Sequence, residues 1–218
     1  MQTKLLINGK LTAGEGKAED VLNPATGKVL ARVAEASREQ VSAAVTAADA
    51  AFEGWARTPP KDRATLLLKL ADRIEADGPG FAKVESQNCG KPYAAALADE
   101  IPAIADVFRF FAGACRNLTS AVSGEYLAGY TSMIRRDPVG VVASIAPWNY
   151  PLMMAAWKLG PALAAGNTCV LKPSEQTPLT ALKLGELLAE LFPAGVVNVI
   201  SGRGASVGAR SPVIRRCG

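Results

Sequence analysis

The chain has 218 residues, of which 49% are hydrophobic, and a formal net charge of +4 at pH 7. This composition allows a sizeable core, in one large domain or two small ones. No apolar run approaches the ~20 residues of a membrane-spanning helix, and the N-terminal apolar stretch is too short for a signal peptide. Three of the 24 basic residues are arginines after residue 209. Without them 21 basic residues face 20 acidic ones, so most of the net positive charge comes from these arginines. The lack of a basic block with interleaved aromatic residues argues against nucleic acid as a partner.

The chain contains no histidine and four scattered cysteines, none of them in a CxxC pair. The lack of histidine excludes a histidine-based catalytic triad and a histidine-ligated metal. Cysteines without paired spacing are typical of reduced thiols in a cytoplasmic protein, rather than of a disulfide framework. We therefore expect a cytoplasmic location and no metal site.

The first 118 residues predict short strands followed by a layer of helices. Residues 4–34 contain strand-like segments separated by turns. Ser37 can cap a helix through about Trp55, and further helices are expected over about 61–76, 81–88 and 95–118. Pro102 predicts an irregularity in the last helix, because proline lacks the N–H that an internal helical position needs.

The pattern changes after residue 123. Residues 124–136 alternate in polarity and predict a β-ribbon that leaves the helical layer. From Val139 onward the pattern is strand, helix, strand, helix, strand, and the last strand covers about 196–200. Nearly continuous apolar strands between helices indicate a parallel sheet with both faces covered. We therefore predict an α/β fold with a partial parallel sheet of the Rossmann type.

Asn149 lies between the first of these strands and the helix that follows it. Pro151 suits the first turn of that helix, where its missing N–H costs nothing. A helix N-terminus favours developing negative charge, so the Asn149 amide and nearby backbone N–H groups can stabilise an oxyanion. The alternative is that Asn149 only caps the helix, and this is the preferred interpretation when the residue is taken alone.

The second strand ends in Leu171-Lys172-Pro173-Ser174-Glu175, at the edge where open parallel sheets bind ligands. The carboxylate of Glu175 can accept both hydroxyls of an adenosine ribose, and it would disfavour a 2′-phosphate. Lys172 can support the same ribose. The alternative is a solvated turn in which Ser174 or Thr177 caps a helix, and this alternative is preferred for the segment alone.

The third strand opens into a glycine-rich turn, Gly202-Arg203-Gly204-Ala205-Ser206-Val207-Gly208. The turn follows a strand, as a dinucleotide fingerprint requires, but it is one residue longer than the usual pattern. Alone it is weak evidence for a nucleotide site.

Taken in order, these segments resemble the aldehyde dehydrogenase family. The resemblance rests on Val142–Pro151, on Trp157–Asn167 and on Leu171–Glu175, and it extends over residues 4 to 208. Two further segments, Asn88-Cys89-Gly90-Lys91-Pro92 and Phe110-Phe111-Ala112-Gly113, are similar to the amino-aldehyde and betaine-aldehyde branch of that family.

The resemblance implies that the cofactor is NAD. Lys172, Ser174 and Glu175 would bind its adenosine end, and Gly204 and Gly208 would face the pyrophosphate. The nicotinamide-ribose side would be lined by Ile145, Ala146, Pro147 and Trp148.

The resemblance also implies roles toward a small aldehyde substrate. Asn149 would hold the oxyanion. Lys158 matches a lysine of a proton relay, and the alternative for it is an ordinary charge on the helix surface. The positions that match the aldehyde channel are Tyr150, Met154 and Trp157, although their helical spacing is also that of core packing. Asp106, or Glu100, would attract a substrate ammonium, although a carboxylate on a helix face is usually only solvated.

The family's reaction needs a cysteine nucleophile, hydride transfer to NAD and a water activated by glutamate. In a family subunit those protein groups lie in motifs beyond residue 218. The cysteines here lie in the helical layer (Cys89 and Cys115), within a strand (Cys169) and in the tail (Cys217), and none suits the role. We expect no turnover from this chain alone, and the alternative function is an NAD-binding or subunit-interaction fragment. The full-length family subunit is expected to form a homo-oligomer, a tetramer.

Residues 209–218 resemble nothing in the family. Codons permitted for residues 210–218, read two bases further on, can encode Ile-Thr-Gly-His-Pro-Ala-Val-Arg, which is similar to the family's continuation. We therefore expect a frameshift near residues 208–210. The expected organisation is the strands and helices of a cofactor domain (1–123), a ribbon from an oligomerisation domain (124–138), an NAD-binding segment (139–208) and a non-family tail (209–218), with the catalytic domain absent.

Overall fold

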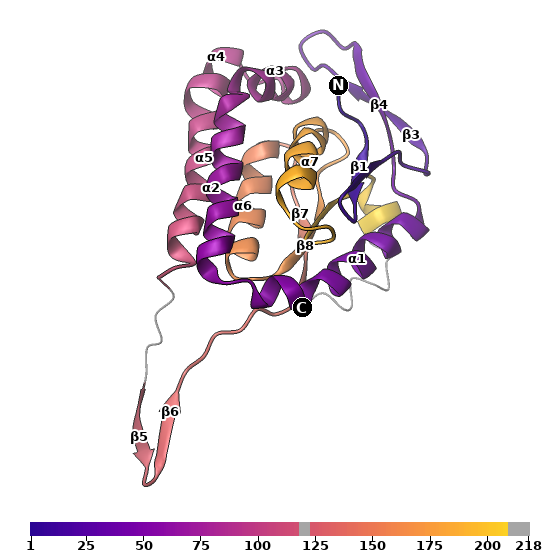
Figure 1. Cartoon of the computed structure of the whole chain (residues 1–218). Coiled ribbons are helices and arrows are strands. Elements are labelled where there is room, and N and C mark those ends of the chain that lie inside the picture. The colour runs from indigo at the N-terminus through magenta and orange to yellow at the C-terminus, as the bar shows by residue number, and fades with distance from the viewer. Residues whose placement is uncertain (118–122, 209–218) are drawn as a thin grey trace.

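The computed structural model describes residues 1–117 and 123–208 (Figure 1). The tail and Cys217 lie outside the described residues. The strands are β1 (Leu5–Ile7), β2 (Lys10–Thr12), β3 (Ala18–Leu22), β4 (Val29–Ala34), β5 (Ser123–Leu127), β6 (Tyr130–Met133), β7 (Val141–Ile145), β8 (Thr168–Lys172) and β9 (Val197–Val199). The α-helices are α1 (Arg38–Arg57), α2 (Pro60–Ala76), α3 (Gly78–Cys89), α4 (Tyr93–Ala95), α5 (Ile101–Ala114), α6 (Pro151–Ala164) and α7 (Leu179–Leu191), and the π-helical turns are η1 (Ala96–Glu100) and η2 (Gly204–Gly208).

Among the described residues, the main sheet has five strands in the order β2-β1-β9-β8-β7. β7, β8 and β9 run parallel, whereas β1 pairs antiparallel with both β9 and β2. All five residues of β8 are buried, as expected of a central parallel strand. The sheet confirms the predicted α/β fold, and β7 forms one of its edges.

Helices cover both faces of this sheet. α1 packs on one face, against β1, β7, β8 and β9, while α6 and α7 connect the parallel strands across the other face. α2 and α5 form a further layer over α6 (Figure 1). The largest fully buried side chains of the core include Phe81, Phe108, Leu67, Leu159 and Leu163. Within the described part of the chain, no helix combines the length and apolarity needed to cross a membrane.

Local signals explain where the helices begin and end. Ser37 Oγ accepts a hydrogen bond from Gln40 N at 3.2 Å, and Gln40 Oε1 accepts one from Ser37 N at 3.1 Å, which is a capping box at the start of α1. α3 ends at Cys89, and the next residue, Gly90, has a φ of +81°, in the left-handed region that glycine adopts without strain. The predicted starts and stops of these helices are therefore close to the observed ones.

The long helix predicted over 95–118 is interrupted. α4 leads into the π-helical η1, and α5 continues only to Ala114. Pro102 is near the start of α5, directly after the π-helical turn. The carbonyls of the turn before a proline must find other partners, because the proline has no N–H to offer them. The predicted irregularity is confirmed, and it falls just before the proline.

β5 and β6 form an antiparallel ribbon that projects from the body of the molecule (Figure 1). Its large side chains are exposed: Tyr126, Leu127, Tyr130 and Met133. The ribbon lies where the alternating pattern predicted one, and it offers an apolar surface that no described element covers.

Candidate functional site

The carboxyl ends of the three parallel strands lie side by side. β7 and β8 end together, since Ile145 pairs with Lys172. The N–H of Ile200, just past β9, donates to Leu171 O at 2.9 Å. The three segments singled out in the sequence therefore leave the sheet together at the carboxyl ends of its parallel strands, which is where open parallel sheets bind ligands.

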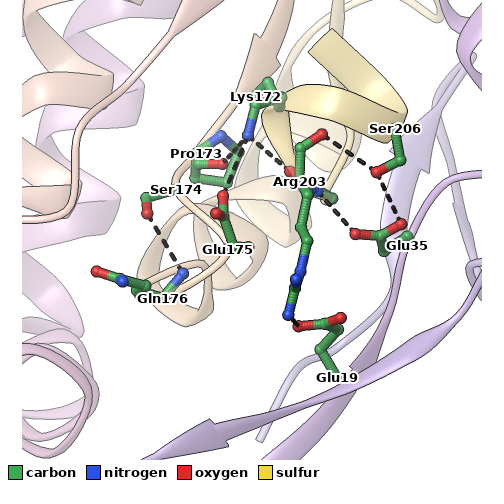
Figure 2. Close-up of polar contacts among 10 residues, drawn as sticks. Glu19, Glu35, Lys172, Pro173, Ser174, Glu175, Gln176, Arg203 and Ser206 are labelled. Atoms are coloured by element: carbon green, nitrogen blue, oxygen red, sulfur yellow. Dashed lines mark hydrogen bonds and ion pairs between the residues drawn. The ribbon is translucent and has the colours of Figure 1, made fainter. Parts of the chain in front are cut away.

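Lys172 connects β8 to the glycine turn. With only 6% of its surface exposed, it donates from Nζ to Pro173 O at 3.0 Å and to Gly202 O at 2.7 Å (Figure 2). The carboxylate of Glu175 lies 3.7 Å from Nζ, within ion-pair range but too far for a hydrogen bond. Burial lowers the pKa of Lys172, and the charge of Glu175 opposes this shift. Because an ammonium has three N–H donors, one donor remains for a group placed between Lys172 and Glu175.

Neither Ser174 nor Thr177 caps α7. The N–H of Leu179, the first residue of α7, donates instead to Asn88 Oδ1 of α3 at 3.1 Å. Ser174 Oγ only accepts the N–H of Gln176 at 3.3 Å, within its own turn (Figure 2). The interpretation of this segment as a helix cap is therefore wrong, and Ser174, like the glutamate that follows it, stays half-buried at the sheet edge.

The glycines of the turn differ in what the fold requires of them. Gly202 has a φ of +151°, and a Cβ there would lie 2.2 Å from Val207 Cγ2. The fold therefore demands glycine at this position. At Gly204, which begins η2, a Cβ would meet no atom within 4 Å, and the backbone is outside the left-handed region. Packing within the described residues gives no reason for glycine at 204. Gly208 ends η2.

The residues that hold the glycine turn from its other side carry no sequence motif. Glu35, buried just after β4, accepts hydrogen bonds from Arg203 N at 2.8 Å and from Ser206 Oγ at 2.9 Å (Figure 2). The Arg203 guanidinium pairs in turn with Glu19 at 2.7 Å. Glu35 and Arg203 are 168 positions apart, so no local pattern could have revealed the contact. Because Glu35 accepts the Arg203 N–H, that N–H is not free for a phosphate, unlike the first donor of a usual dinucleotide fingerprint.

Asn149 does not cap α6. The capping position is Tyr150, with φ −137° and ψ 66°, and no side chain there bonds the helix. The Asn149 side chain is exposed and makes no hydrogen bond with the described residues. The Leu152 N–H donates to Glu85 Oε1 of α3 at 3.3 Å. The capping interpretation is therefore wrong, and the Asn149 amide is available to a ligand.

The residues expected beside the nicotinamide are mostly accessible. Ile145, the last residue of β7, is exposed, as are Pro147 and Trp148 after the strand, whereas Ala146 is buried. Ala146 therefore offers almost no surface to a ligand, and its N–H donates to Lys172 O at 3.0 Å.

The predicted substrate residues fall in different places. Asp106 of α5 and Trp157 of α6 line one pocket of about 440 Å³, together with Val107, Phe110 and Phe111. Met154 and Lys158 are half-buried on α6 and do not line this pocket, nor does Tyr150. The structure therefore places Asp106 and Trp157 in the lining of one pocket and the other three outside that lining.

Glu100 cannot serve as the ammonium site offered as an alternative to Asp106. It is buried, and its Oε2 pairs with Lys91. The Lys91 Nζ also lies 4.0 Å from the centroid of the Tyr150 ring. The carboxylate is thus already neutralised within the chain, whereas Asp106 is exposed.

The described thiols are poor nucleophiles. Burial raises the pKa of Cys169 in β8 to about 12, and it raises the pKa of Cys89 and of Cys115 as well. The thiolate is the reactive form of cysteine, so a raised pKa disfavours reaction. Over residues 1–117 and 123–208, no three His, Cys, Asp or Glu side chains are grouped as metal ligands would be.

Three parallel strands in the order β9-β8-β7, joined by helices on one face, are half of a doubly wound, dinucleotide-binding sheet. The particular family follows from sequence: the profile of the aldehyde dehydrogenase family matches residues 11–211. The chain belongs to this family.

Individual relatives agree with the family assignment. The mitochondrial aldehyde dehydrogenase of Leishmania tarentolae is 47% identical over 213 residues, which cover 95% of this chain and 42% of the relative. The phenylacetaldehyde dehydrogenase of Pseudomonas fluorescens is 44% identical over 94% of this chain and 43% of its own length. The NAD⁺ complex of an aldehyde dehydrogenase from Bacillus cereus superposes with a TM-score of 0.92 at 44% identity, over 96% of this chain and 43% of that one. The chain thus spans about two fifths of the length of these relatives.

Proposed function

We propose that this chain is the NAD-binding part of an aldehyde dehydrogenase that oxidises an amino-aldehyde to its acid. The observation that carries the proposal is the pair formed by Lys172 and Glu175, separated by 3.7 Å at the carboxyl edge of the sheet. A ribose hydroxyl between them accepts the remaining Lys172 N–H and donates to the carboxylate. A 2′-phosphate at the same place would face the negative charge of Glu175, so NAD is favoured over NADP.

The rest of the edge fits the same cofactor. Gly204 faces open space, which lets a pyrophosphate approach the backbone closely. The exposed side chains of Ile145 and Trp148 continue the surface toward the end of β7. When bound, NAD supplies the acceptor for the hydride that leaves the aldehyde carbon.

Asn149 is the residue of this chain that would act on the substrate. Its exposed amide donates a hydrogen bond to the aldehyde oxygen as negative charge develops there, and the N-terminus of α6 stabilises the same charge. Lys158, on the same helix, is proposed to move a proton. Since the described thiols are poorly reactive, we assign the nucleophile to a catalytic domain outside these 218 residues, and we expect the chain alone to turn over no aldehyde.

The pocket between α5 and α6 supports an amine-bearing substrate. Phe110 and Trp157 expose aromatic surface there, beside the carboxylate of Asp106. Aromatic faces and a carboxylate together attract an ammonium group. Within the amino-aldehyde and betaine-aldehyde branch, we propose that the chain most resembles gamma-aminobutyraldehyde dehydrogenase. The substrate that suits this resemblance is 4-aminobutanal, oxidised to 4-aminobutanoate in the cytoplasm.

Cofactor titration tests the proposal. NAD and NADP are added to the purified chain while the fluorescence of Trp148 and Trp157 is followed, and we expect NAD to bind more tightly. Glu175→Gln should narrow the difference between the two cofactors, because it removes the charge that opposes a 2′-phosphate. Glu190→Gln is the matched control, since Glu190 pairs with Arg73 on the surface. Equal affinity of the unmodified chain for both cofactors, or binding of neither, would overturn the assignment.

A second function, as a subunit-interaction fragment, is favoured by the ribbon. Tyr126, Leu127, Tyr130 and Met133 are all exposed on β5 and β6. Apolar side chains gathered on a projecting element are typical of a subunit contact. We propose that the ribbon joins subunits of a tetramer, and light scattering of the chain mixed with a full-length relative tests this. The formation of no mixed species would exclude it.

We also propose the frameshift near residues 208–210. Codons permitted for residues 210–218, read two bases further on, can encode a segment similar to the family's continuation, and that segment contains a histidine, which the 218 residues lack. Sequencing the gene from codon 195 tests this proposal. Codons that forbid the shifted reading would refute it.

A further inference from the structure

The segment that carries Asn149 is attached to other elements on both sides of the asparagine. Trp148 O accepts a hydrogen bond from Thr177 Oγ1 at 3.1 Å. The N–H of Leu152 donates to Glu85 Oε1 at 3.3 Å, across 67 positions of sequence. Asn149 itself bonds to none of the described residues, so the direction of its amide depends on its neighbours.

A third attachment acts on the residue next to Asn149. Lys91 Nζ lies 4.0 Å from the centroid of the Tyr150 ring and also pairs with Glu100 Oε2. Glu100 is the last residue of the π-helical η1. π-Helical turns are rare and are frequent at functional sites. Here the turn ends on the carboxylate that holds Lys91 beside the ring.

Packing alone does not account for the two buried carboxylates. Glu85 is 1% exposed and Glu100 is 5% exposed, and each has one oxygen with no hydrogen-bond partner among the described residues. Burial raises the pKa of Glu85, which reflects the cost of placing its charge there. A buried polar atom without a partner destabilises a fold. The other oxygen of each carboxylate supports the Asn149 segment, directly from Glu85 and through Lys91 from Glu100.

We propose that Lys91 and Glu85 are positioning residues, which hold Tyr150 and Leu152 and thereby fix the direction of the Asn149 amide. The importance of that direction for catalysis rests on the proposed function, since an oxyanion donor must already point at the position where charge develops. The geometric statement is independent of it and can be measured in the chain without any turnover.

The test uses NMR relaxation of the ¹⁵N-labelled 218-residue chain. The order parameter of the Asn149 backbone amide should be near 0.85, which is typical of rigid backbone, and in Lys91→Met it should fall below about 0.6. The signals of the Asn149 side-chain amide should narrow in parallel. Lys91→Arg keeps a cation beside the ring and should preserve the order. Glu85→Gln keeps an acceptor for Leu152 and should preserve it too, whereas Glu85→Leu should not.

The chain offers a matched control at the other end of α3. Lys183 pairs with Asp77 at 2.6 Å and lies 4.8 Å from the centroid of the Phe81 ring, so it combines the same two interactions as Lys91. Lys183→Met should therefore cost comparable stability and leave Asn149 ordered. A merely structural role of Lys91 predicts that the two variants behave alike.

Two results would overturn the proposal: an Asn149 segment that stays ordered in Lys91→Met, or one that is loosened equally by Lys183→Met. If Lys91→Met does not fold, Tyr150→Leu removes the ring while it keeps the ion pair of Lys91 and Glu100, and the same loss of order is expected. Failure of the proposed function is visible separately, as a chain that does not bind NAD although Asn149 is ordered.

Discussion

Separate alanine replacements of Gly202 and Gly204, two of the three glycines of the turn, should distinguish a glycine that the fold requires from one that a ligand requires. In Gly202→Ala the new Cβ would lie 2.2 Å from Val207 Cγ2 and the backbone would have to keep a φ of +151°. A strained backbone conformation costs about 1–3 kcal/mol, and overpacking costs about as much again. We therefore expect the free energy of unfolding to fall by roughly 2–6 kcal/mol.

Gly204→Ala should behave differently, because a Cβ there meets nothing within 4 Å. Its free energy of unfolding should change by no more than about 0.5 kcal/mol. The Cβ would instead enter the space proposed for the pyrophosphate. A loss of about 1.4 kcal/mol in binding, which raises the Kd for NAD about tenfold, is the expected scale.

Thermal unfolding followed by circular dichroism, together with NAD titration, distinguishes the two variants. For a chain of this size each kcal/mol lowers Tm by about 2–4 °C, so Gly202→Ala should lower it by at least about 4 °C. Gly54→Ala is the control, since Gly54 lies on the exposed side of α1 and its Cβ also meets nothing. The reasoning is refuted if Gly204→Ala loses as much stability as Gly202→Ala, or if it binds NAD as tightly as the unmodified chain.

Three further predictions concern charge, thiols and capping. Burial raises the pKa of Glu85 above 4.5, so above pH 4.5 the folded chain keeps a proton that the unfolded chain has lost, and the free energy of unfolding falls as pH rises toward the folded pKa. In urea titrations at a series of pH values above 4.5, Glu85→Gln should abolish this fall in the unfolding midpoint. At about pH 8 a maleimide should label Cys89, which is only half-buried, slowly because burial raises the pKa of Cys89, but still faster than Cys169, whose pKa is about 12. Peptide mass mapping that finds equal labelling of the two thiols would contradict the burial argument. Ser37→Ala should lower the free energy of unfolding by about 1 kcal/mol, and an unchanged urea midpoint would show that the capping box contributes nothing.

The sequence allowed the elements to be predicted because their signals are local. The Ser37 capping box, the turn at Gly90 and the apolar strands from Val139 onward each involve residues a few positions apart. Asn149 and Glu175 could be proposed for the same reason, since each directly follows a strand of the parallel sheet. Periodicity and position after a strand thus provided the fold and the candidate edge.

The supports of the candidate site could not be predicted, because they act between distant parts of the chain. Glu85 reaches the start of α6 across 67 positions, and Asn88 reaches the start of α7 across 91. This also explains why the capping interpretations were wrong. An asparagine or serine before a helix usually caps it. Here two side chains of α3, Glu85 and Asn88, accept hydrogen bonds from N–H groups at the starts of α6 and α7 instead.

These contacts give the N-terminal part of the chain a definite role in the site. Glu35 holds the glycine turn, and α3 with the segment after it holds the residues around Asn149. α1 covers the face of the sheet opposite α6 and α7. A segment reduced to 139–208 would keep every residue proposed to touch the cofactor, yet it would lose the carboxylates that fix both the turn and the start of α6. Because a donor is effective only when it is already oriented, we propose that the first hundred residues belong to the candidate site even though none of them is proposed to contact the cofactor.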